Sequence, residues 1–120
     1  MAKAPMKTTA EVVSGSVEIL YKSDYEAEAI TLDTTAFTSG VCKAGTPMAR
    51  DGKKGATTAA TETAAASTTA FGILLSDVYE DRPQGTVVYM GTINEAVAKD
   101  HSGVTIDATM KAAMPRITFM

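Results

Sequence analysis

Residues 41–52 read VCKAGTPMARDG, and residues 70–78 read AFGILLSDV. Each stretch holds a short apolar run next to glycine, proline or an Asp-Gly pair, which are the residues of tight turns. Short apolar runs bounded by turns are typical of buried strands. Neither stretch carries a pattern of catalytic residues, so the sequence indicates a structural module built on strands.

The length and composition of the chain predict one small domain of modest stability. At 120 residues the chain is long enough to bury a core of its own. Hydrophobic residues make up 45%, but aromatic residues are only 6% and tryptophan is absent, so large apolar side chains are scarce. We therefore expect oligomerisation to add to the stability of the fold.

Charge and cysteine content argue against several classes of partner. The net charge is -3, and no basic stripe is present of the kind that neutralises phosphates, so no nucleic acid is expected as a partner. With one cysteine the chain cannot form an internal disulfide. No apolar run reaches the length of a secretory signal or of a membrane span, so no membrane partner is expected.

Two regions are expected along the chain. Residues 1–15 are small, polar and interrupted by proline and glycine, and they are predicted to form a flexible N-terminal arm. Residues 16–120 are predicted to form a single β-rich domain. Its first strand is expected where Val17, Ile19 and Tyr21 alternate with other residues at a period of two.

Strand patterns recur along this domain. Residues 26–32 suit either a short helix or a strand, and the strand is preferred. Pro47 cannot donate a ladder hydrogen bond, which places its strand at a sheet edge or a corner. The clearest feature is a hairpin between residues 71–78 and 86–90, in which Gly72 indicates a close backbone approach or a bulge.

Helix and loop signals complete the expected fold. Asn94 and Asp107 are expected to cap short helices that begin after them. Residues 56–70 are an almost unbroken alanine, threonine and serine series and are predicted to form a long surface loop. The predicted fold class is α+β and β-rich: a small β-sandwich or barrel-like domain with one or two short helices and an extended N-terminal arm.

Few residues are candidates for chemistry. His101 is the only histidine and Cys42 the only cysteine, so no histidine-pair metal motif and no multi-cysteine zinc set exists. Cys42 is expected to be a buried hydrophobic residue and His101 a solvent-exposed imidazole. Asp77, Glu80 and Asp81 are expected to be solvated turn acids, with paired acid-base carboxylates as the alternative. We predict no enzyme activity, no cofactor and no metal.

Residues 43–48 read KAGTPM, residues 70–74 read AFGIL and residues 87–91 read VVYMG. These patterns of glycine, proline and apolar residues resemble the head decoration proteins of tailed bacteriophages, the lambda type and the related head-fibre proteins. The similarity covers residues 41–93, and residues 110–119 also look like the end of several such proteins.

The resemblance implies a structural virion protein. It implies a homotrimer that binds the outer surface of the capsid at three-fold or quasi-three-fold sites after expansion and stabilises the shell. The partner would be the major capsid protein, and the chain would be made in the host cytoplasm and located in the virion. The family also implies an N-terminal arm that orders on the capsid.

The composition of the N-terminal residues is consistent with such an arm. A segment of this composition can add a strand to an exposed sheet edge of the shell protein. The residues expected to contact the capsid are Thr8, Val12, Val13, Val17 and Ile19.

A ligand-binding or carbohydrate-binding β-domain displayed on a particle surface is the alternative function. Such a domain needs a concave or aromatic platform. The candidate residues are Tyr21, Tyr25, Tyr79 and Tyr89, together with the three phenylalanines. Tyr79 and Tyr89 are expected to be able to face each other across the hairpin. The methionines are expected to fill gaps in the core, with an interface role as the alternative, first for Met114 and Met120.

Overall fold

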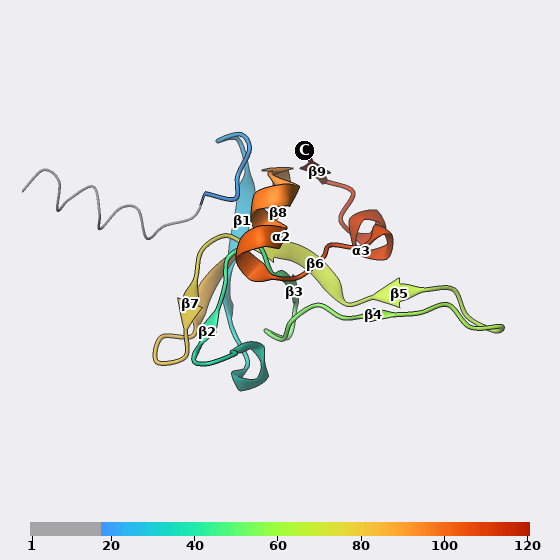
Figure 1. The fold of residues 1–120 in the computed structure, drawn as a ribbon, viewed down its shortest axis with the longest axis horizontal. Coiled ribbons are helices and arrows are strands. Elements are labelled where there is room, and N and C mark those ends of the chain that lie inside the picture. Colours follow the sequence, from blue (N-terminus) through green and yellow to red (C-terminus); the bar gives the residue numbers. More distant parts are fainter. Residues whose placement is uncertain (1–17) are drawn as a thin grey trace, which may run out of the picture.

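The computed structural model describes residues 18–120 (Figure 1). Its centre is a five-stranded sheet in which β1, β8, β6 and β3 run antiparallel in that order, and β9 pairs parallel with the end of β8. The strands are β1 (Glu26–Thr31), β3 (Pro47–Ala49), β6 (Ala70–Leu74), β8 (Gln84–Ile93) and β9 (Ile117–Phe119). Within the described residues β1 and β3 do not pair with each other, so the sheet is open.

Smaller elements surround the central sheet. Two short ladders pair β2 (Val41–Cys42) with β7 (Val78–Tyr79) and β4 (Thr57–Thr58) with β5 (Ser67–Thr68). The helices in the described part of the chain are the 3-10 helix η1 (Thr34–Ala36), α2 (Glu95–Ser102) and α3 (Ala108–Ala113). The predicted α+β, β-rich fold class with two short α-helices is confirmed, but the open sheet does not form the barrel-like alternative. The predicted arm over residues 1–15 lies outside the described residues.

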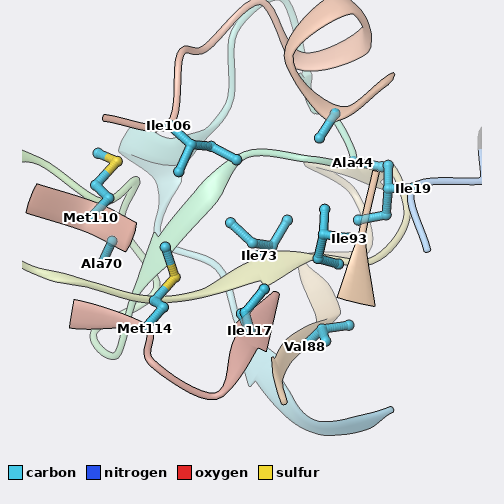
Figure 2. Packing of buried hydrophobic residues seen from close by; sticks show 11 residues of the cluster. Ile19, Ala44, Ala70, Ile73, Val88, Ile93, Ile106, Met110, Met114 and Ile117 are labelled. Carbon is cyan, nitrogen blue, oxygen red and sulfur yellow. The ribbon is translucent and has the colours of Figure 1, made fainter. Parts of the chain in front are cut away.

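Apolar residues are buried on both faces of the sheet. On the face that α2 and α3 cover (Figure 2), the cluster consists of Ile19, Ala44, Ala70, Ile73, Val88, Ile93, Ala98, Ile106, Met110, Met114 and Ile117. The second cluster consists of Leu32, Ala36, Cys42, Met48, Leu74, Val78 and Val87. Ile73 and Leu74 are neighbours in β6 but belong to different clusters, because successive side chains of a strand point to opposite faces. This explains the continuous apolar run of β6.

The predicted hairpin is present at its centre and altered at its end. β6 and β8 pair antiparallel, with Ile73 opposite Val88 and Leu74 opposite Val87. Further along the chain, β7 pairs with β2 rather than with β8. The predicted strand over residues 71–78 is therefore two strands that belong to two different sheets.

Two glycines permit close packing around β6 and β3. A Cβ atom at Gly72 would lie 2.5 Å from the backbone oxygen of Val88 and 2.5 Å from Cγ1 of Val87, so the predicted close approach is confirmed. Gly45 has a φ of +92°, and a Cβ atom there would lie 2.7 Å from the carbonyl oxygen of Ala98 in α2. These glycines let β8 and α2 pack directly against their neighbours.

Both predicted helix caps are present. The side chain of Asn94 accepts a hydrogen bond from the N–H of Val97, and the side chain of Asp107 accepts one from the N–H of Met110. α2 ends at Ser102 and is followed by Gly103, which adopts the left-handed conformation of a C-terminal cap.

Other strand expectations meet mixed outcomes. Residues 26–32 do form a strand, β1, and Pro47 does begin an edge strand. The strand expected around residues 17–21 is wrong over the described positions, where Leu20 makes a single bridge to Ile93. Residues 56–70 are not a loop alone, because β4 and β5 pair and form a hairpin that projects from the body (Figure 1).

Candidate functional site

Most residues expected to contact a capsid lie outside the described residues, namely Thr8, Val12, Val13 and Val17. Ile19 is described, and it is fully buried in the cluster covered by α2 and α3. Its carbonyl oxygen accepts a hydrogen bond of 2.7 Å from the N–H of Asn94, the residue that caps α2. Ile19 is therefore a core residue of the domain and does not belong to a free arm in this structure.

Three exposed apolar residues lie on either side of the last residues of β8. Tyr21, Tyr25 and Met120 are among its exposed large hydrophobic residues. The backbone N–H groups of Tyr21 and Met120 donate hydrogen bonds of 2.8 and 2.9 Å to carbonyl oxygens within residues 91–93, and Tyr25 packs against the same stretch of β8. The described chain also begins here. We call the surface formed by Tyr21, Tyr25 and Met120 the β8–β9 end.

Asp77 connects three separate parts of the chain. Its Oδ1 atom accepts a hydrogen bond of 2.8 Å from the N–H of Ala44, which follows β2, and lies 2.8 Å from Nε2 of His101 in α2. Partial burial of Asp77 favours the neutral acid, but the hydrogen bonds from Ala44 and His101 outweigh it and hold the pKa of Asp77 below its ordinary value of 3.8. The ionised carboxylate thus fastens α2 to the strands.

The prediction that His101 and Asp77 are exposed to solvent is wrong, because the two side chains contact each other. Only 19% of the His101 side chain and 24% of the Asp77 side chain are accessible to solvent. His101 lies in the last turn of α2, where its ring contacts Asp77. The missed signal is Lys99 and His101 followed by Gly103, a combination typical of a helix C-terminus.

A second surface is built on β2 and β7. Val41 lies opposite Tyr79 in the ladder, and Tyr79 also bridges to Arg82 across the tight turn that follows β7. Asp77 and Tyr79 line the same hollow. We call the surface formed by Val41, Asp77, Tyr79 and Arg82 the Tyr79 face.

Two open hollows flank the pair formed by Asp77 and His101. The first has a volume of about 570 Å³ and is lined by Asp77, Val78, Tyr79, Asp81, Arg82 and Gln84. The second has a volume of about 580 Å³ and borders His101, with Lys43 and Lys54 among its lining residues. Together they place aromatic, acidic, basic and amide groups within one stretch of surface.

Two observations concern the cysteine and the metal-ligating residue types of the described chain. Cys42 is buried, as predicted, and burial raises the pKa of its thiol, which disfavours the reactive thiolate. Within residues 18–120, no three histidine, cysteine or acidic side chains are grouped to hold a metal ion. Over the same residues, every helix is too short or too polar to cross a bilayer.

The methionines and tyrosines divide between core and surface. Met48, Met110 and Met114 are buried, so their expected gap-filling role is confirmed, whereas Met120 is exposed. The hydroxyl of Tyr89 donates a hydrogen bond of 3.0 Å to Oε1 of Glu26 in β1. Tyr79 belongs to the separate β2–β7 ladder, so the expectation that it faces Tyr89 across a hairpin is wrong.

Comparisons with family models, with characterised proteins and with solved structures find no match for this chain.

Proposed function

We propose that this chain is a structural virion protein that binds the outer surface of a phage capsid as a homotrimer at three-fold or quasi-three-fold sites after expansion. On this proposal it binds the major capsid protein and stabilises the shell. The supporting observation is the position in the fold of the three segments that resemble head decoration proteins. KAGTPM leads into β3, AFGIL is β6 and VVYMG lies in β8, and these three strands are neighbours in the central sheet. The resemblance thus follows one contiguous structural unit.

The β8–β9 end is the proposed contact surface of the folded body. Its exposed side chains, Tyr21, Tyr25 and Met120, are of the types enriched at protein interfaces. The other proposed contacts, Thr8, Val12, Val13 and Val17, lie outside the described residues.

A binding role of this kind requires no catalytic residue. The most reactive side-chain types of the chain are already engaged in the fold: Cys42 is buried and His101 is paired with Asp77. Three copies in one trimer would engage the shell together, and the high effective concentration of linked contacts lets each individual contact be weak. A small surface on each protomer is then sufficient.

Co-sedimentation tests the proposal. The purified full chain is mixed with expanded heads of its source phage that have been stripped of decoration, and with unexpanded proheads as the control. The proposal predicts saturable binding to expanded heads only. Absence of binding to both kinds of particle contradicts it.

Matched tyrosine variants locate the contact. Tyr21 and Tyr79 are exposed to nearly the same degree, 54% and 56%, but only Tyr21 belongs to the β8–β9 end. We expect the double variant Tyr21→Ser, Tyr25→Ser to weaken head binding by about tenfold or more, because aromatic anchors dominate interface energies. We expect Tyr79→Ser to bind heads as the unchanged chain does. If Tyr79→Ser weakens head binding and the double variant does not, the β8–β9 end is not the contact surface.

A further inference from the structure

Tyr79 is an exposed aromatic residue on a fixed backbone. The residue is 56% exposed, although its backbone pairs with Val41 in β2 and bridges to Arg82. The N–H of Glu80 also donates a hydrogen bond of 3.0 Å to the oxygen of Gly40, which ties the turn to the β2 side. An exposed ring on a rigid element loses little conformational freedom when it binds a ligand.

The groups around this ring are planar and polar. The hollow beside Tyr79 is lined by Asp77, Asp81, Arg82 and Gln84, whose side chains carry carboxylate, guanidinium and amide groups. These groups supply hydrogen-bond donors and acceptors side by side. Its volume of about 570 Å³ is within the range of small-molecule sites. A ligand with several hydroxyl groups and one apolar face matches this arrangement.

The hollow beside Tyr79 has no excess positive charge. Its charged lining residues are Asp77, Asp81 and Arg82. Two acidic groups against one basic group do not attract phosphate-rich or highly acidic ligands. This lining favours a ligand without acidic groups.

A protein partner fits this surface less well. The centre of a protein interface is an apolar cluster, and its hot-spot residues are grouped. Tyr79 is isolated, since the other exposed large hydrophobic residues of the described chain, Tyr21, Tyr25 and Met120, all lie at the β8–β9 end.

From these observations we propose that the Tyr79 face binds a neutral saccharide. The ring of Tyr79 contacts the apolar face of the sugar, and Asp77, Asp81, Arg82 and Gln84 hydrogen-bond to its hydroxyl groups. The site lies apart from the β8–β9 end, so a decorated particle would carry it independently of capsid docking.

A glycan array with neutral and acidic members tests the proposal on the full chain. We expect retention on neutral glycans, and we expect NMR titration with a retained glycan to shift the amide signals of Tyr79, Arg82 and Gln84 in a saturable way. Retention of no neutral glycan, or equal or stronger retention of acidic glycans, would overturn the proposal.

Variants distinguish a ring contact from an effect on folding. Tyr79→Ser is expected to weaken glycan binding about tenfold, and Tyr79→Phe, which keeps the ring, is expected to retain most of it. Tyr21→Ser removes an equally exposed tyrosine and is expected to leave glycan binding unchanged. If Tyr79→Ser binds glycans normally, or if it abolishes head binding instead, the Tyr79 face is not a saccharide site.

Discussion

Asp77 is the residue through which the chain links α2 to its strands, and its ionisation predicts how stability depends on pH. Because its folded-state pKa lies below the ordinary value of 3.8, the ionised form stabilises the fold fully at neutral pH. This contribution is lost as the pH falls below 3.8 and through the lower folded-state pKa. Asp77→Asn should therefore lower the free energy of unfolding by on the order of 1 kcal/mol at neutral pH, a modest value because the pair is partly exposed.

Urea unfolding of the Asp77→Asn variant and of the unchanged chain measures the difference in their free energies of unfolding. The gap between Asp77→Asn and the unchanged chain is expected to shrink between about pH 5 and pH 2, where the native carboxylate becomes protonated. A gap that stays constant over this range would show that the charge of Asp77 does not contribute to stability.

Gly72 sets the distance between β6 and β8. A methyl group at this position would meet the backbone oxygen of Val88, which cannot move without disturbing the ladder. We expect Gly72→Ala to reduce the free energy of unfolding by about 1 to 3 kcal/mol. Thr58→Ala, in the exposed β4 strand, is the control and should change it by less than about 0.5 kcal/mol. Equal effects of the two substitutions in urea unfolding would contradict the packing role of Gly72.

Single residues also show what the sequence can and cannot predict about the site. The burial of Cys42 and the caps at Asn94 and Asp107 follow from local patterns, and they are present. The contact between His101 and Asp77 joins residues 24 positions apart, so no local pattern announces it. The end of α2 at Gly103, which places His101 inside the helix, was also missed.

The β4–β5 hairpin is an element that the core does not need. It contributes no residue to either buried cluster and its side chains are almost all exposed. We expect that replacing residues 59–66 with a short glycine-containing turn changes the free energy of unfolding by less than about 1 kcal/mol, because loop length affects stability only weakly. Loss of cooperative unfolding in this variant would show that the hairpin belongs to the core.

Elements with local signals were more predictable than the pairing between distant elements. The strand β1, the edge position of Pro47 and both helices follow from turn, cap and periodicity rules. The pairing of β7 with β2 and the parallel pairing of β9 with β8 depend on contacts between segments far apart in the sequence. The β4–β5 hairpin was missed because alanine, threonine and serine give no alternation of apolar and polar residues.

At the scale of the whole molecule, two separate surfaces carry the two proposals. The β8–β9 end has three exposed apolar residues, whereas the Tyr79 face combines one exposed ring with acidic, basic and amide side chains. A decoration protein that docks through the first surface would leave the second free for another ligand. The capsid role is the central claim, and it depends on where the domain sits on a shell.

Electron cryomicroscopy of expanded, stripped heads incubated with the full chain tests that claim most directly. The account predicts added density at three-fold or quasi-three-fold sites, with three copies of the domain in each and the β8–β9 end facing the shell. Heads without added density, or domains bound with the β8–β9 end pointing away from the shell, would contradict it.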